Sequence, residues 1–204
     1  MKLLCLPLLF LISCSAPEKH ELLKEGRIHY QITYGPETDS SVTNLLPDEM
    51  TLRFKGNVLY CKLSGGLGSL KPGLIINGDA GNIIYLNVMD STAIIKPLQA
   101  IMYPGGHKTS GTTKILNYPC TEFTHKIDDF KMSVSAADDI PFQMPGTVLV
   151  EGFYLSDINK MPLEVTMTME NFSSIYKADD VISESQPDSL FEIPSWRKVR
   201  VEAK

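Results

Sequence analysis

The feature of the sequence that most restricts its fold is a recurring alternation of apolar and polar residues. In residues 163–170, leucine, valine and methionine at odd positions alternate with glutamate and threonine at even positions. Residues 27–34 and 50–55 show the same period of two. In an extended strand this period places one set of side chains on each face. The pattern therefore predicts antiparallel strands with one buried face and one face in water.

Two further runs, residues 83–89 and 148–155, are apolar at nearly every position. Such runs are typical of strands in the middle of a sheet, or of strands covered on both faces. Turn sequences such as Asn77-Gly78-Asp79 separate the runs. Helical periodicity is confined to two short stretches, 39–46 and 97–103. We expect a mainly β (α+β) fold, with residues 26–204 forming a single domain.

The first 13 residues differ in character from the rest of the chain. Lys2 supplies a positive charge, and an apolar run then extends from Leu3 to Ile12. A helix that crosses a bilayer needs about 20 apolar residues, so this run is too short. Its length and its flanks are typical of a secretory signal peptide, which we expect over residues 1–13.

The end of this segment, Leu11-Ile12-Ser13-Cys14, resembles the lipobox of bacterial lipoproteins. The resemblance implies that Cys14 carries the acyl chains and becomes the first residue of the mature protein. An ordinary signal peptide with a coincidental cysteine is the alternative. Residues 14–25 are then the lipidated cysteine and a polar tether to the membrane. Ser15 favours the outer membrane, where the protein would face the periplasm or the cell surface.

Composition and motif searches argue against several function classes. The formal net charge is −5 and the basic residues are not clustered, so we expect no nucleic-acid partner. The four histidines lack metal-ligand spacing, and His29 and His125 lie at positions expected to be exposed to solvent. The Gly-rich stretch 64–73 lacks the ending of a phosphate-binding loop, and no Gly-x-Ser-x-Gly elbow is present. We therefore expect no enzyme activity, no metal and no cofactor.

The cysteines leave two interpretations open. Cys5 belongs to the signal peptide and Cys14 to the lipid anchor, so only Cys61 and Cys120 remain. An oxidising envelope permits a disulfide between them, which would stabilise the fold by about 4 kcal/mol. Two free buried thiols are the competing interpretation.

The order of short motifs from residue 26 to residue 199 carries a second resemblance. It includes Gly26-Arg27-Ile28, Tyr118-Pro119-Cys120 and the closing Leu190-Phe191-Glu192-Ile193-Pro194. This order is similar to secreted and lipoprotein families of Bacteroidota with a LolA/LolB-like fold. The resemblance implies a strongly curved antiparallel sheet that forms an unclosed barrel, with short helices plugging its concave side. In the carrier members of that superfamily, the cavity between sheet and helices holds acyl chains.

From this resemblance we expect a cavity for a lipid, an acyl chain or another apolar ligand. Methionine adapts to ligands of irregular shape, and residues 140–147 could form a loop at the cavity mouth or a plain connection. The candidate lining residues are Tyr30, Phe54, Met132, Phe142, Met144, Met167 and Met169. The predicted function is a non-enzymatic, outer-membrane lipoprotein that binds an apolar ligand. The alternative is a structural or protein-interaction lipoprotein, with envelope-protein partners and a core filled by its own side chains.

Overall fold

The computed structural model describes residues 22–70, 73–98, 107–127, 129–141, 147–148, 154–155, 158 and 160–202. The signal peptide predicted over residues 1–13 and the lipidation predicted at Cys14 lie outside these residues. Two of the candidate cavity residues, Phe142 and Met144, also lie outside them.

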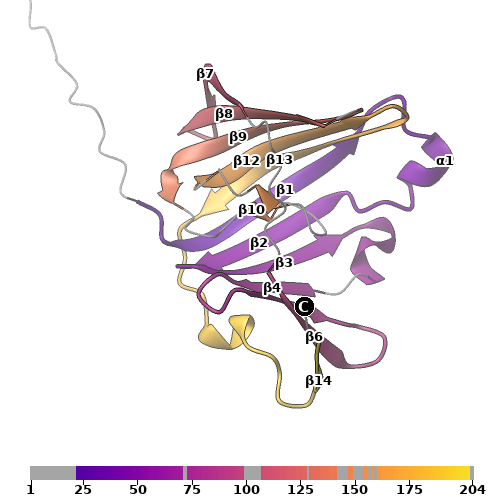
Figure 1. The fold of residues 1–204 in the computed structure, drawn as a ribbon, viewed down its shortest axis with the longest axis vertical. Coiled ribbons are helices and arrows are strands. Elements are labelled where there is room, and N and C mark those ends of the chain that lie inside the picture. The colour runs from indigo at the N-terminus through magenta and orange to yellow at the C-terminus, as the bar shows by residue number, and fades with distance from the viewer. Residues whose placement is uncertain are drawn as a thin grey trace, which may run out of the picture.

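Strands dominate the described part of the chain (Figure 1). In chain order, the strands of the main sheet are β1 (Glu25–Tyr34), β2 (Glu49–Lys55), β3 (Val58–Ser64), β4 (Gly73–Asn77), β5 (Asn82–Leu86), β6 (Thr92–Pro97), β7 (His107–Ile115), β8 (Tyr118–Ile127), β9 (Phe130–Pro141), β12 (Lys160–Met169), β13 (Phe172–Ile182) and β14 (Lys198–Val201). A separate pair consists of β10 (Thr147–Val148) and β11 (Tyr154–Leu155). The helical elements are α1 (Ser40–Thr43), η1 (Gly66–Leu70) and η2 (Asp188–Phe191).

The main sheet has 12 strands in the order β14-β6-β5-β4-β3-β2-β1-β13-β12-β9-β8-β7. Two meanders meet where β1 pairs with β13, and every neighbouring pair is antiparallel except β14 with β6. The order ends at β14 and at β7, so the sheet curves strongly without closing into a barrel (Figure 1). This confirms the predicted mainly β fold with a strongly curved, unclosed antiparallel sheet.

The period of two places the main core on the concave face of the sheet. Along β1 and β2 the residues at even positions, such as Tyr30 and Met50, are buried between less buried neighbours. Along β12 the predicted inward residues Leu163 and Val165 are fully buried. Side chains from β1–β5, β7–β9, β12 and β13 all belong to this one cluster, because the curvature of the sheet turns their inner faces toward each other.

A second, smaller core lies on the outer face of β3–β6. Ile75 and Ile84 point away from the main core and pack in a separate cluster. Ile193 packs against this cluster, so the segment 183–197 covers this part of the outer face. Because the outer face is covered here, the run at 83–89 can be apolar on both of its faces. The strand that this run forms, β5, spans Asn82–Leu86.

The other two-faced run, 148–155, does not form one strand of the main sheet. Thr147 pairs with Leu155 and Val148 with Tyr154, so the chain reverses between β10 and β11. The prediction of a central strand there was wrong. An apolar run alone does not indicate where a chain turns, and Gly152, which weakens a strand interior, was the available signal.

The helical elements are short and lie at the periphery of the sheet. Asp39 caps α1 by accepting a hydrogen bond from the backbone N–H of Ser41, within the stretch predicted as helical at 39–46. α1 and η1 lie at one end of the strands, and η2 lies on the outer face beside the second core. On the concave side, the described residues that fill the space include Ile140 and Ile158.

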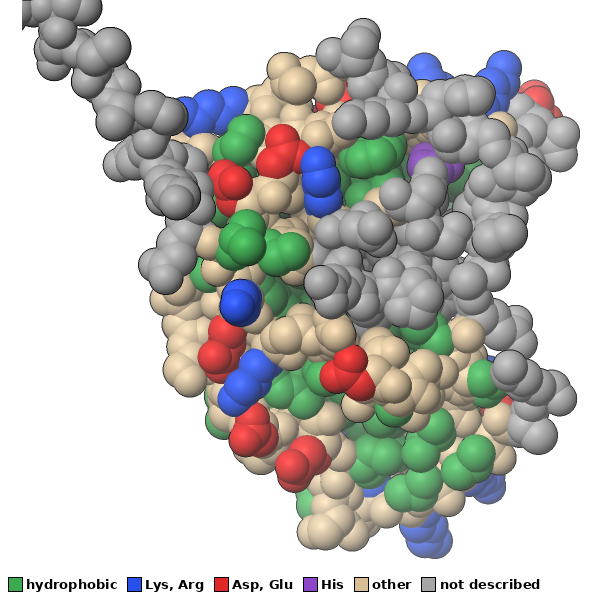
Figure 2. Space-filling model, turned by 60° about the vertical axis from the view of Figure 1, so that its left-hand side comes forward, with side chains coloured by type: hydrophobic (Ala, Val, Ile, Leu, Met, Phe, Trp, Pro, Cys, Tyr) green, Lys and Arg blue, Asp and Glu red, His purple; other side chains and the backbone are tan. Residues whose placement is uncertain are grey.

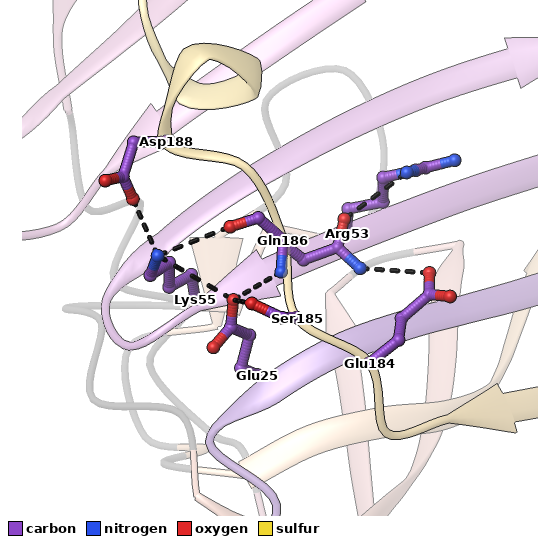
Figure 3. A network of polar contacts seen from close by, with 7 residues as sticks. All are labelled: Glu25, Arg53, Lys55, Glu184, Ser185, Gln186 and Asp188. Atoms are coloured by element: carbon purple, nitrogen blue, oxygen red, sulfur yellow. Dashed lines mark hydrogen bonds and ion pairs between the residues drawn. The ribbon is translucent and has the colours of Figure 1, made fainter.

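A polar network fixes the segment 183–197 to the sheet (Figure 3). The side chain of Lys55 donates to the backbone carbonyl of Gln186 and to the carboxylate of Asp188. The carboxylate of Glu25 accepts from the backbone N–H of Gln186. The start of β1, the end of β2 and the C-terminal segment are therefore held together at one corner of the molecule.

Candidate ligand-binding site

The concave face brings together four of the candidate cavity residues. Tyr30 comes from β1, Phe54 from β2, Met132 from β9 and Met167 from β12, and all four belong to the main core. Each lies on the inward side of its strand because it falls on the buried phase of the alternation. The four side chains therefore share one buried cluster, and their role in binding a ligand stays a prediction.

Methionines form one region of this face. Met132 and Met167 are direct partners across the β9–β12 pairing, and Met161 is buried on the same strand as Met167. Methionine is unbranched and has three rotatable side-chain bonds, so it can fill irregular space and rearrange at low cost. This region is the part of the core that can most easily change shape.

Few polar groups interrupt the apolar face. The hydroxyl of Tyr30 donates a hydrogen bond of 2.7 Å to the backbone carbonyl of Pro162 on β12. Burial raises the pKa of Tyr30 well above its usual value, so the hydroxyl stays protonated and serves as a structural donor. The polar tip of this large side chain is thereby satisfied inside the core.

His125 corrects one expectation from the sequence. It was expected to be exposed, but only 2% of its surface is accessible, and it pairs across β8–β9 with Met132. Phe123 and His125 both face inward, because they are two residues apart along β8. The position of the apolar Phe123 could therefore have indicated that His125 is buried.

The described part of the concave face is closely packed. Tyr30 and Met132 have 0% of their surface accessible, Phe54 has 1% and Met167 has 6%. A side chain that lined an empty, water-sized cavity would keep accessible surface, so these residues border almost no such space. A ligand would therefore have to displace side chains that are in contact in this state.

Met169 has a different position. It continues the inward row of Met167 along β12 but is 42% exposed, because the strand ends there. It borders a surface hollow of about 510 Å³ with Lys126, Asp129, Thr168 and Glu170. Sequence reasoning missed this hollow, because its walls come from two hairpin connections that are distant in the sequence.

The two remaining cysteines do not form the disulfide that was one of the two interpretations. Cys61 on β3 and Cys120 on β8 are both free and buried. Their strands stand six places apart in the order β3-β2-β1-β13-β12-β9-β8. Burial raises the pKa of Cys61 to about 12 and that of Cys120 to about 11. Both thiols are therefore protonated near neutral pH, which makes them poor nucleophiles.

The outer polar face of β1 carries His29. Nδ1 of His29 lies 2.7 Å from Asp179, and Nε2 lies 3.7 Å from Glu49. Within the described ranges, no group of three or more His, Cys, Asp or Glu side chains is arranged to hold a metal ion. None of the helices in those ranges is long and apolar enough to cross a membrane.

Charges of both signs are interspersed on the surface. On the face seen in Figure 2, Lys and Arg side chains lie among Asp and Glu side chains, and hydrophobic side chains reach the surface between them. This distribution agrees with the mixed charges of the sequence, whose formal net charge is −5.

No family model and no curated protein matches the sequence. Among solved structures, the chain resembles PNGF-II with a TM-score of 0.57 at 16% identity, covering 87% of this chain and 31% of that one. It also resembles an uncharacterized conserved protein from Thermus thermophilus, with a TM-score of 0.52 at 10% identity over 89% of this chain and 92% of that one. The chain thus spans about a third of the length of PNGF-II.

At such low identity these likenesses show the fold alone. A third comparison, with the Mycobacterium tuberculosis lipoprotein LppX, reaches a TM-score of only 0.35 at 11% identity over 80% of this chain and 89% of that one, and no conclusion rests on it.

Proposed function

We propose that the protein is a non-enzymatic lipoprotein of the cell envelope that binds an acyl chain, or another apolar ligand, against the concave face of its sheet. Cys14 would anchor it to a membrane, and we favour the outer membrane. The observation that carries the proposal is the continuous apolar face of an open, curved sheet. Such a face can remove hydrocarbon from water.

The chemistry of the face fits a hydrocarbon ligand. Each methylene that leaves water contributes about 0.8 kcal/mol, so a long acyl chain offers enough free energy to displace packed side chains. The region around Met132, Met161 and Met167 would yield first, because these side chains rearrange most easily. The two outermost strands, β7 and β14, are not paired with each other, so the sheet can widen without breaking hydrogen bonds between strands.

A non-enzymatic role is supported by the state of the reactive groups. Cys61 and Cys120 are held as neutral thiols by their raised pKa. Both ring nitrogens of His29 face carboxylates, so neither is directed at a hydroxyl or thiol nucleophile.

A second candidate function is favoured by the close packing. Because Tyr30, Phe54 and Met132 have at most 1% of their surface accessible, the core can be complete without a ligand. The protein would then act through its outer surfaces, as an interaction or structural lipoprotein of the envelope.

One experiment separates the two candidates. A soluble chain of residues 15–204, purified from a bacterial periplasm, is measured by native mass spectrometry and then extracted with organic solvent. The proposal expects a lipid bound near one per protein, or uptake of a fluorescent fatty acid. Met132→Ala, which opens space on the concave face, should change that uptake, whereas Leu116→Asn at an exposed site should not.

The contrary result is equally clear. An apo mass, with no fatty-acid uptake by the natural chain or by Met132→Ala, would refute ligand binding and leave the second candidate.

A further inference from the structure

Exposed apolar side chains gather on the connections at one end of the sheet. We define the apolar rim as Val42, Leu45, Leu67, Leu70, Met89 and Trp196. Their exposed fractions run from 43% at Val42 to 81% at Met89. Adjacent exposed apolar side chains at this density are characteristic of a contact surface, whereas scattered single ones are ordinary.

The strand register places these connections side by side. Glu49 pairs with Ser64, so the β1–β2 and β3–β4 connections lie at the same end of the sheet (Figure 1). The backbone N–H of Leu67 donates to the carbonyl of Leu45 at 2.8 Å, so these two connections are in contact. Gly73 pairs with Leu86, which brings the β5–β6 connection to the same end.

Trp196 extends the rim beside the β5–β6 connection. The side chain of Arg197 donates to the backbone carbonyls of Asn87 and Thr92, which fixes the segment before β14 to that connection. The guanidinium of Arg197 also lies over the Trp196 ring, 4.4 Å from its centroid. An exposed tryptophan with a charged neighbour suits the boundary between lipid headgroups and hydrocarbon.

The charges on the rim restrict what can meet it. Glu37, Asp39, Asp48 and Asp90 are exposed on the same connections. None of the four forms an ion pair with any other residue that the structure describes. Among the described residues they outnumber the basic side chains around the start of β14, which are Arg197, Lys198 and Arg200, so the rim would repel an anionic surface. The acidic groups also complement the ammonium groups that zwitterionic lipids present to water.

We propose that the apolar rim docks on a zwitterionic bilayer, with its leucines and Met89 in the hydrocarbon boundary and Trp196 at the headgroups. The apolar side chains are spread over separate connections, one or two on each, along an edge of the sheet. A bilayer accepts such side chains independently, whereas a protein hot spot is a compact, central pocket. A bilayer is therefore the occupant that the arrangement fits best.

This surface is distinct from the proposed lipid anchor. β1 begins at Glu25, which pairs with Lys55 at the opposite end of the sheet from the rim. The tether that leads to Cys14 therefore leaves from the other end, about 30 Å from the rim given the usual rise per strand residue. Docking by the rim would thus be a second membrane contact, and it holds whether or not the concave face binds a ligand.

The chain has one tryptophan, Trp196, so its tryptophan fluorescence reports on the apolar rim alone. A chain of residues 15–204, without acyl groups, is mixed with phosphatidylcholine vesicles while tryptophan emission is recorded. Docking predicts a blue shift, quenching by brominated lipid, and flotation of the protein with the vesicles. Replacing a third of the lipid with phosphatidylglycerol should weaken binding at low salt.

Variants test the assignment to the rim. The double substitution Leu45→Ser with Leu67→Ser should weaken vesicle binding at least tenfold, since both side chains would insert. Leu116→Asn is the matched control, because it removes a leucine exposed to 40% at the opposite end of the sheet. Asparagine also tolerates the positive φ of 49° at that position, so the fold should be kept.

Several outcomes would overturn the proposal. They are the absence of both a blue shift and flotation at millimolar lipid, an unchanged affinity in the double variant, and tighter binding to anionic than to zwitterionic vesicles. A dimer in light scattering that the double variant abolishes would instead assign the rim to a second copy of the chain.

Discussion

Met132 on β9 and Met167 on β12 face each other as cross-strand partners within the buried concave face. Met132→Ala would remove most of a fully buried side chain and leave a cavity beside Met167. We expect the free energy of unfolding to fall by about 2–5 kcal/mol in urea titrations. Met89→Ala, at a site that is 81% exposed, should change it by less than about 0.5 kcal/mol. A loss below about 1 kcal/mol at Met132 would show that the methionine region collapses readily around a void.

Two tyrosines offer a matched test of buried hydrogen bonding. Tyr30 donates to the carbonyl of Pro162 at 2.7 Å, and Tyr34 donates to that of Pro47 at 2.6 Å. Tyr30 is fully buried, whereas Tyr34 is only partly buried. Tyr30→Phe should cost about 1–3 kcal/mol, since the carbonyl of Pro162 loses a partner that water cannot replace. Tyr34→Phe should cost less, because this hydrogen bond is only partly buried and water can replace the lost hydroxyl there. Equal losses in urea titrations would contradict this explanation.

Stability should decline in alkaline solution. The pKa is raised to about 12 for Cys61 and Tyr34 and to about 11 for Cys120. In the unfolded chain cysteine ionises near pH 8.5 and tyrosine near pH 10. Above these values the unfolded chain loses protons that the folded chain retains, so the unfolded state is favoured. The melting temperature should therefore be steady up to about pH 8 and fall progressively from about pH 9 to pH 12.

A variant tests the origin of this decline. Cys61→Ala removes one of the buried acids, so its melting temperature should fall less steeply between about pH 9 and pH 11 than that of the natural chain. The two curves are compared after each is normalised to its value at pH 7, which removes the packing cost of the substitution. Identical slopes would show that Cys61 does not contribute.

The number of reactive thiols should differ between the folded and the unfolded protein. In a chain of residues 15–204 without reductant, a thiol-reactive dye should label neither Cys61 nor Cys120 while the protein is folded, because both are buried. Both should react once the chain is unfolded, and dithiothreitol should not change the melting temperature. A denatured chain with no reactive thiol would show that a bridge forms after all.

Much of the fold was predictable wherever one face of a strand meets water. The alternation around Tyr30 and Leu163 identified strands and their inward faces, including the burial of Tyr30 and Met167. The alternation misled where a polar side chain lies on the buried face of its strand. His125 was judged by its polarity, whereas its phase relative to Phe123 determines its burial.

The rest depended on contacts that local pattern does not encode. The length of a strand run does not indicate a reversal, so β10 and β11 were taken as one strand. Ile193 covers the outer face of strands that lie far from it in the sequence, and a local pattern cannot predict such a contact. Cys61 and Cys120 are both free, and whether two cysteines meet depends on the three-dimensional fold, which a count of cysteines cannot supply.

The buried amide of Gln186 leads to a final prediction about this C-terminal segment. Its side-chain oxygen accepts from Arg53 at 3.3 Å and its amide nitrogen donates to Glu184 at 3.0 Å, while only 2% of the residue is exposed (Figure 3). Gln186→Ala would leave the partly buried guanidinium of Arg53 without this acceptor, so we expect a loss of about 1–2 kcal/mol. The loss should be local at first, because Ile193 of this segment packs against the smaller core and not against the main one.

Hydrogen exchange is the appropriate measurement, since it resolves local opening. Gln186→Ala should speed exchange along residues 185–193 and β5, while amides in β1 and β12 should keep their protection. Ser185→Ala is the control, because its hydroxyl makes only an exposed contact of 3.3 Å to Glu25. Faster exchange spread evenly over the sheet would mean that the segment and both cores unfold as one unit, and that Gln186 does not hold a separable cover over the outer face.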